Sequence, residues 1–430
     1  GANLSNSNFV SATLKNTNFS NANLTNAVMS SGYTTVDSTA NFTDADISGA
    51  QIKFSKEQLY STKSYKEKNL MGVSFIGGGN YDVYDLIGWD FSSQDLTGSK
   101  FSICYLRSAS FKDAIIEGCY FKIYEPTSGS RQGIYWSQIA STKSYKEKNL
   151  RGITFEGTNT NNSLFYPGNF VAQDLTNSVF KNMSIFGVDF TDAILHNTTF
   201  ERVSAKKADF TRADFRGATI NFVTESGYDS SPVYKNTIMA DGVIKNFAMA
   251  SGADSFTVRR YTPATSDGEM ISAKISESNA TVSGGAELKL DTGARLDIVN
   301  KKALTIAENG VLIIDTAASD PTQIYVEALA GLSVNGKVNV NITESLLDNV
   351  EYQFDLIAFE DDSKVSNLKD LKPDESIYLT IKGKTFNGYW NCVINENKFT
   401  ILATQVPEPA TIAAIFGALA LGLAVYRRRK

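Results

Sequence analysis

Residues 188–217 read VDFTDAILHNTTFERVSAKKADFTRADFRG, and in this stretch one position in five is occupied by a core-type side chain: Phe190, Leu195, Phe200, Ala205, Phe210 and Phe215. Neither an α-helix nor a β-strand keeps one residue in five on the same face. A coil built from four short sides does. The stretch therefore predicts a coiled, repetitive β structure in place of ordinary amphipathic elements.

The same five-residue period recurs through about half of the chain. It runs through Leu4–Met29, Phe42–Ile52, Phe91–Phe121 and Phe170–Ile220. A chain of 430 residues is longer than one compact core usually supports, and a regular repeat favours a solenoid over several globular domains.

These repeats, for example Ala22-Asn23-Leu24-Thr25-Asn26 and Ala213-Asp214-Phe215-Arg216-Gly217, resemble the pentapeptide-repeat family. The resemblance implies a right-handed quadrilateral β-helix, with four pentapeptides in each coil and with the small residue and the Leu or Phe pointing inward. Cys104 and Cys119 occupy the small inward position and are expected in the core. His196 directly follows the centre Leu195, an outward position in the family pattern, so we expect it on the solvated surface.

Composition excludes several classes of function. The net charge is −5 with both signs interspersed, which leaves no basic stripe for nucleic acid. The three cysteines have neither CxxC nor Cys/His ligand spacing, so we predict no metal site and no disulfide framework. The only histidine has no companion ligand, and acidic residues such as Asp209 and Asp214 lie in the Asp/Asn position of the repeat, so we expect no catalytic residue and no cofactor. The chain opens at Gly1 within a repeat, and we expect an upstream segment that carries a signal peptide.

A decapeptide, STKSYKEKNL, occurs without change at residues 61–70 and 141–150. The flanking residues match as well, so the duplicated unit is about eighty residues. Helix formers and two candidate capping boxes, Ser55 to Gln58 and Ser64 to Glu67, predict short helical turns beside the coil. A charged run on a short helix is usually its solvated face, but its lysines are also candidate contacts for an anionic ligand: Lys63, Lys66, Lys68, Lys143, Lys146 and Lys148.

From about residue 225 the period changes. Apolar pairs two residues apart repeat every eight residues, as in Leu288/Leu290, Leu296/Ile298, Leu304/Ile306 and Leu312/Ile314. Such pairs give short strands with one apolar face. A second β-solenoid and an antiparallel β-meander both satisfy this pattern, and a resemblance to β-helical adhesin passengers favours the solenoid.

The last 25 residues combine three parts. The motif Val406, Pro407, Glu408, Pro409 precedes 17 uncharged residues, Ala410–Tyr426, and the chain ends on Arg427, Arg428, Arg429, Lys430. The uncharged stretch is just long enough for a transmembrane helix, and the basic cluster would stay cytoplasmic. All three parts match the PEP-CTERM sorting domain. The resemblance implies processing by an exosortase near the Pro-Glu-Pro motif and association with exopolysaccharide or biofilm.

The predicted fold is mainly β, and the interpretation of the whole chain is a non-catalytic, exported cell-surface or matrix protein. It would be anchored in the inner membrane as a precursor, with an exosortase and exopolysaccharide as partners and no nucleic acid. Two alternatives stay open: a polysaccharide-active β-helix enzyme, and a DNA-mimicking gyrase inhibitor. The expected segments are pentapeptide coils at 1–55, 70–135 and 150–224, helical inserts at 56–69 and 136–149, a β-rich region at 225–405 and the tail at 406–430.

Overall fold

The computed structural model describes residues 1–30, 34–77, 83–122, 133–158, 165, 168–223, 231–250, 252, 254–264, 271–361, 363–368, 371, 373, 376–395 and 397–406. The chain divides into two units, Gly1–Ala240 with Pro263–Gly268, and Asp241–Thr262 with Glu269–Lys430. The first unit extends past the expected boundary at residue 224. Val233 and Ile238 still bridge to Asp209 and Asp214 of the coil before them.

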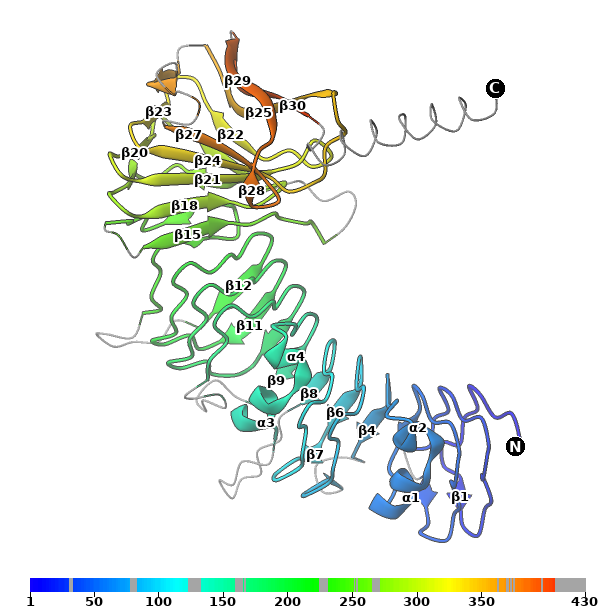
Figure 1. The fold of residues 1–430 in the computed structure, drawn as a ribbon. Helices are drawn as coiled ribbons and strands as arrows, with labels where there is room; N and C mark the ends of the chain where they lie inside the picture. The colour runs from blue at the N-terminus through cyan, green and yellow to red at the C-terminus, as the bar shows by residue number, and fades with distance from the viewer. Residues whose placement is uncertain are drawn as a thin grey trace, which may run out of the picture. The chain divides into compact units, whose positions relative to one another are not determined.

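The first unit is a stack of parallel-paired coils (Figure 1). Phe180 of one coil pairs with Phe200 of the next, and Asn3 with Asn23, so a coil without an insert takes twenty residues, or four pentapeptides. One side forms an eight-stranded sheet in the order β12-β11-β10-β9-β8-β6-β4-β3. The strands of this unit are β1 (Thr13–Leu14), β2 (Thr35–Val36), β3 (Gln51–Ile52), β4 (Ser74–Ile76), β5 (Tyr84–Asp85), β6 (Lys100–Ser102), β7 (Cys104–Tyr105), β8 (Tyr120–Lys122), β9 (Thr154–Glu156), β10 (Val179–Lys181), β11 (Thr199–Val203), β12 (Thr219–Phe222) and β13 (Thr237–Ile238).

The turns between the sides of the coil account for two positions of the repeat, the Asp or Asn before the centre and the residue that ends the repeat. The Asp or Asn before a centre accepts a hydrogen bond from the backbone N–H two residues later, as Asp209 does from Thr211 at 2.8 Å and Asn23 from Thr25 at 3.0 Å. The residue after that N–H lies in the left-handed region, with φ of 58° at Arg212 and 59° at Asn26. Asn and Gly tolerate this conformation best, which is why they end so many repeats.

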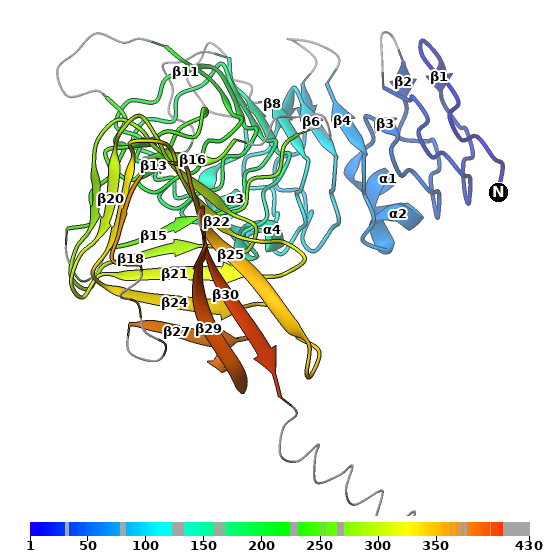
Figure 2. The ribbon, with the colours of Figure 1, turned by 90° about the horizontal axis from the view of Figure 1, so that it is seen from above.

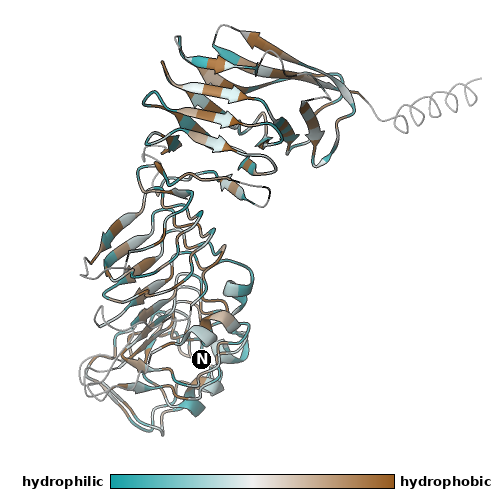
Figure 3. Cartoon of the chain, turned by 90° about the vertical axis from the view of Figure 1, so that its left-hand side faces the viewer, coloured by the Kyte–Doolittle hydropathy of each residue, from teal (hydrophilic) through white to brown (hydrophobic). Residues whose placement is uncertain are grey.

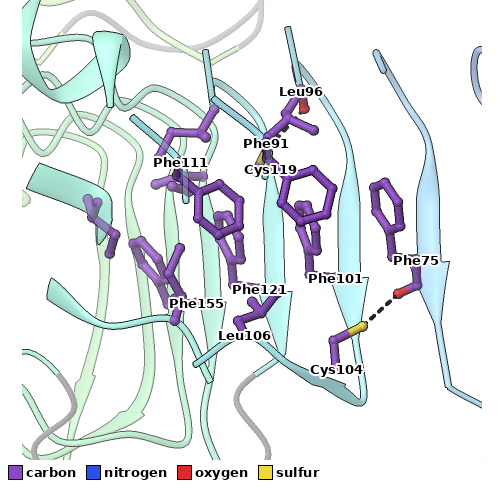
Figure 4. Packing of buried hydrophobic residues seen from close by; sticks show 14 of the residues in the cluster. Phe75, Phe91, Leu96, Phe101, Cys104, Leu106, Phe111, Cys119, Phe121 and Phe155 are labelled. Atoms are coloured by element: carbon purple, nitrogen blue, oxygen red, sulfur yellow. Dashed lines mark hydrogen bonds between the residues drawn. The ribbon is translucent and has the colours of Figure 1, made fainter. Parts of the chain in front are cut away.

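The core of the first unit is a ladder of aromatic rings (Figure 4). Phe75, Phe101 and Phe121 stack face to face with ring centroids 4.8 and 5.2 Å apart. Each ring is essentially inaccessible to solvent, so each contributes roughly 2–3 kcal/mol through burial. The expectation that Cys104 and Cys119 lie in the core is confirmed: both are buried, and their thiols donate to the carbonyls of Phe75 and Leu96.

Two pairs of short helices interrupt the coils on one flank (Figures 1 and 2). They are α1 (Lys56–Ser61), α2 (Lys63–Lys66), α3 (Trp136–Ser141) and α4 (Lys143–Lys146). Each pair lies within one of the predicted inserts.

The second unit is built from three sheets whose strands pair in parallel from one coil to the next as far as β24. Leu288 pairs with Leu312, Leu296 with Ile324 and Leu304 with Leu332, so each coil contributes one strand to each sheet. Pairs between successive coils from β15 to β24 are all parallel, which a meander would not give. The strands are β14 (Ile244–Lys245), β15 (Ser255–Val258), β16 (Ala273–Ile275), β17 (Ala280–Val282), β18 (Glu287–Leu290), β19 (Arg295–Ile298), β20 (Ala303–Ile306), β21 (Val311–Thr316), β22 (Gln323–Val326), β23 (Gly331–Val334) and β24 (Lys337–Ile342).

The eight-residue apolar pairs are the inward residues of these strands. Leu288, Leu290, Leu296 and Ile298 are fully buried, while Glu287, Lys289 and Arg295 between and beside them are more exposed; Asp297 is the exception, with 9% of its surface exposed. Figure 3 shows the resulting alternation of hydrophobic and hydrophilic residues along the strands.

The end of the second unit changes to antiparallel pairing. The remaining strands are β25 (Glu351–Phe359), β26 (Lys364–Ser366), β27 (Ile377–Ile381), β28 (Lys384–Thr385), β29 (Gly388–Asn395) and β30 (Lys398–Gln405). β30 pairs antiparallel with β25 on one side and with β29 on the other. In Figure 2 these three strands form a ribbon with β29 at its border.

Candidate functional site

The two helical inserts are fixed to the coil by the same hydrogen bonds. The Nε2 of Gln58 donates to the carbonyls of Asp37 and Ala40, at 2.8 and 3.0 Å. Gln138, eighty residues later, donates in the same way to Leu106 and Ala109, at 2.8 and 2.7 Å. The inserts are therefore equivalent in structure as well as in sequence.

Of the two candidate capping boxes, one is confirmed and one is wrong. Ser55 and Gln58 form a reciprocal cap at the start of α1. The second helix is capped by Thr62, whose hydroxyl accepts from the N–H of Tyr65 at 3.2 Å. Ser64 instead accepts from the N–H of Ile47 in the neighbouring coil at 2.9 Å, which ties α2 to the solenoid.

Each lysine of the duplicated decapeptide has a partner within the chain. Lys66 pairs with Asp44 at 2.7 Å and Lys146 with Asp113 at 2.5 Å. Lys63 and Lys143 lie 4.0 and 3.9 Å from Glu67 and Glu147. The ammonium groups of Lys68 and Lys148 lie over the rings of Tyr65 and Tyr145, each 5.4 Å from the ring centroid.

These contacts are half-exposed and therefore weak. The side chains of Lys66 and Lys146 keep 49% and 51% of their accessible surface, and exposed ion pairs contribute only about 0–1 kcal/mol. The Lys146 ammonium lowers the pKa of Asp113. The fold thus places four of the six lysines beside exposed carboxylates and the other two over tyrosine rings, and none of these contacts is a strong one.

A buried ion cluster lies near the end of the first unit, where the sequence predicted only surface. Arg216 forms a fork onto Asp214, with Nε to Oδ1 at 3.0 Å and a terminal nitrogen to Oδ2 at 2.6 Å. The Nε2 of His196 lies 2.9 Å from the same Oδ2. Asp214 is 0% and Arg216 1% exposed.

The expected exposure of His196 is thus wrong: its exposed fraction is 5%. Thr176 and Arg216, twenty residues before and after His196, are buried as well, so the family pattern of inward and outward positions does not decide burial at this position. Burial alone would raise the pKa of Asp214, but Arg216 and His196 outweigh it and hold the pKa well below its ordinary value. Asp214 is therefore an ionised structural partner, and it also accepts from the N–H of Arg216 as the cap of its own turn.

One signal in the sequence could have found part of this cluster. Because an uninterrupted coil takes twenty residues, residues twenty apart lie above one another, and His196 and Arg216 are such a pair. The same spacing gives Arg212 with Asp192 at 2.7 Å and Lys181 with Glu201 at 3.0 Å. A search for opposite charges at i and i+20 would have identified these two ion pairs, and the same spacing places His196 beside Arg216; Asp214 lies 18 residues after His196 and is not found by it.

The predicted sorting tail lies almost wholly outside the described residues. Of the motif, only Val406 is described; its N–H donates to the carbonyl of Asn387 at 3.1 Å. Pro407, Glu408, Pro409, the predicted transmembrane helix at 410–426 and Arg427–Lys430 fall beyond it. No helix in the described part of the chain is long and apolar enough to cross a membrane.

Comparison with known proteins identifies the repeat. A family model described as pentapeptide repeats matches residues 1–31 and 184–221, in eight copies. No curated protein matched the chain.

Two solved structures are similar over much of their own length. One is HetL, a pentapeptide repeat protein involved in heterocyst differentiation regulation from the cyanobacterium Nostoc sp. strain PCC 7120, at 14% identity over 57% of this chain and 92% of that chain, with a TM-score of 0.18. The other is a trypsin-treated variant of QnrB1, a plasmid-mediated fluoroquinolone resistance protein, at 14% identity over 80% of this chain and 92% of that chain, with a TM-score of 0.14.

The family match and the twenty-residue coil agree on the same repeat. Residues 1–31 and 184–221 are therefore pentapeptide repeats.

Proposed function

We propose that the chain is a non-catalytic structural protein, exported to the cell surface or extracellular matrix and sorted there by an exosortase through its C-terminal tail. The observation that carries the proposal is the order of features after β30: Val406-Pro407-Glu408-Pro409, then 17 uncharged residues, then Arg427–Lys430. The precursor would be held in the inner membrane by this tail until processing removes it.

The geometry of the first unit supports a passive scaffold. Three acidic side chains of its last coils are already engaged: Asp209 caps a turn, Asp214 neutralises Arg216, and Asp192 binds Arg212 through two hydrogen bonds of 2.8 and 2.7 Å. Carboxylates engaged in this way are explained without catalysis. The family resemblance adds a right-handed, four-sided cross-section to the proposal, which suits a stiff rod.

We place the contact with exopolysaccharide on the flank that carries both inserts. The backbone N–H groups of Lys63 and Lys143 donate to the carbonyls of Ala45 and Ala114. On this side of the unit, successive coils place Asp46, Asn69, Asp95 and Ile115 at the same position. Three coil steps at the usual strand spacing put the two inserts about 14 Å apart. The flank thus presents two identical sets of half-exposed cations, a spacing that an extended anionic polysaccharide could follow.

The sorting part of the proposal is tested in a host that contains an exosortase. Alanines in place of Pro407-Glu408-Pro409 should leave an unprocessed, membrane-bound precursor, detected by fractionation and by mass. As a matched control, lysines in place of Arg427–Arg429 keep the positive charge and should leave membrane insertion intact. Normal processing of the alanine variant would refute the exosortase assignment.

The binding part is tested by sedimentation of the full chain with host exopolysaccharide. Replacing Lys63, Lys66 and Lys68 with methionine should weaken co-sedimentation, and the same change at Lys143, Lys146 and Lys148 should weaken it further. Methionine at Lys289 and Lys337, in the second unit, is the control. Shortening of the polymer would instead support an enzyme, and inhibition of gyrase in a supercoiling assay would support a DNA mimic.

A further inference from the structure

Among the described strands, β29 forms the edge of a sheet. It ends the six-stranded sheet β16-β19-β22-β25-β30-β29, and it pairs with β30 over its whole length, from Gly388 opposite Gln405 to Asn395 opposite Lys398. In the described part of the chain no strand pairs with its other side. A free edge of this length offers a row of backbone donors and acceptors to another strand.

The backbone groups on the free side can be assigned. The N–H of Val406 donates to the carbonyl of Asn387, and with the register above this makes the odd-numbered residues of β29 the hydrogen-bonded partners of β30. A second hydrogen bond agrees, because the N–H of Phe359 donates to the carbonyl of Asn397. In this register the backbone groups of the odd-numbered residues of β30 point toward β25, and those of its even-numbered residues point toward β29. The outward N–H and C=O groups are therefore those at Gly388, Trp390, Cys392 and Ile394.

β29 lacks the features that usually prevent a sheet edge from pairing with another strand, which are charged side chains and proline. Its sequence, GYWNCVIN, contains no charge and no proline. Tyr389 is 77% and Ile394 44% exposed. The terminal strands of the other large sheets are shorter: β12 and β15 have four residues, β16 has three, and β28 has two with a lysine. Short edges offer fewer backbone groups for pairing.

We propose that β29 pairs edge to edge with β29 of a second copy of this chain, antiparallel and across a two-fold axis at Asn391. Outward residues must face outward residues, and the register centred on Asn391 places Gly388 opposite Ile394 and Trp390 opposite Cys392. The four outward N–H groups of each copy then all find acceptors. This inference is independent of the proposed function.

The same register is favourable for the side chains. Tyr389 of one copy lies opposite Val393 of the other, and aromatic and β-branched residues are a stabilising cross-strand pair. Asn391 faces its own symmetry mate, so the two amides can bond to each other. The strand is uncharged, so no like charges oppose each other between its two copies, and the two-fold operation closes the assembly as a dimer.

The position on the axis gives a sharp test with the full chain in a mild detergent. In sedimentation velocity, the dimeric fraction of the wild type should rise as the protein concentration is raised over a roughly hundredfold range. Asn391→Lys and Asn391→Asp each place like charges opposite each other and should lower the association constant roughly tenfold or more. An equimolar mixture of the two variants should restore the dimer, since Lys then faces Asp.

The controls separate this interface from other contacts. Thr281→Lys adds the same charge on an exposed face elsewhere in the second unit and should leave the dimer intact. Cys392 lies diagonally opposite its own mate, about 7–8 Å away, so a short bis-maleimide should link wild-type copies but not those of Asn391→Lys. A monomeric wild type, a dimeric Asn391→Lys protein or a mixture that fails to reassociate would overturn the proposal.

Discussion

The buried carboxylate of Asp214 gives the most demanding test of the first unit. Asparagine at this position keeps the turn cap, because Asn fills the same position in many repeats and accepts the same backbone hydrogen bond. It removes the charge that faces Arg216, whose side chain is 1% exposed. Removing one partner of a buried pair usually costs about 3–5 kcal/mol, so we expect Asp214→Asn to lose that much unfolding free energy.

Asp209 is the matched control. It also caps a turn, through the N–H of Thr211 at 2.8 Å, but it lies outside the ion cluster. Asp209→Asn should therefore cost about 0.5 kcal/mol or less. Urea unfolding followed by tryptophan fluorescence measures both, with Trp390 replaced by phenylalanine so that only Trp89 and Trp136 of the first unit report.

The pH dependence checks the charge itself. The folded pKa of Asp214 lies below its unfolded value, so its ionisation adds stability above the unfolded value of about 4, and this stability is lost as the pH falls toward the folded pKa. The difference between wild type and Asp214→Asn should hold from neutral pH down to about 5 and shrink below about 4. Equal costs for the two asparagine variants at neutral pH would refute the argument that the buried charge of Asp214 stabilises Arg216.

Three further predictions concern the turns, the inserts and the thiols. Ala172 has a φ of 55°, so Ala172→Gly should raise the unfolding free energy of the first unit by about 1 kcal/mol, whereas Thr191→Gly, outside the positive-φ positions, should lower it. Gln58→Ala and Gln138→Ala each leave two backbone carbonyls without their hydrogen-bond donor, so each should lower the unfolding free energy, measured in urea, by a similar amount of about 1–3 kcal/mol. Clearly unequal losses would contradict the equivalence of the inserts. Thiol titration should find only Cys392 reactive in the native chain, at a rate that rises toward its pKa of about 11, since burial raises the pKa of Cys104 and Cys119 and denaturant is needed to expose them.

The five-residue period was enough to predict the first kind of coil, and the eight-residue period was enough to predict strands with one buried face, because each period reports which side chains face inward. Phe190, Phe200 and Leu288 could be assigned to a core from spacing alone. The pairing direction in the second unit could not, since parallel and antiparallel strands share the same alternation. β25, β29 and β30 show that both directions occur in one unit.

The burial of His196 was missed for a different reason. A repeat pattern assigns each residue to the inside or outside of its own coil, but burial on the outside depends on what else covers that face. The lysines of the inserts show the complementary limit. Their sequence indicated charge, yet their partners Asp44 and Asp113 come from coils 22 and 33 residues away, and only the folded stack brings these groups together.

The duplication of the insert also sets how the molecule can grow. Asp46 and Ile115 hold equivalent places on one side of the coil, so the eighty-residue copy added whole coils and left the register of everything after it unchanged. A further copy of the block, inserted at the same joint, would lengthen the first unit by about 14 Å and add a third insert at the same interval. The number of copies of the block therefore sets the length of the first unit. Recombination between the repeats can change this length, because each added block makes the same contacts as the blocks already present.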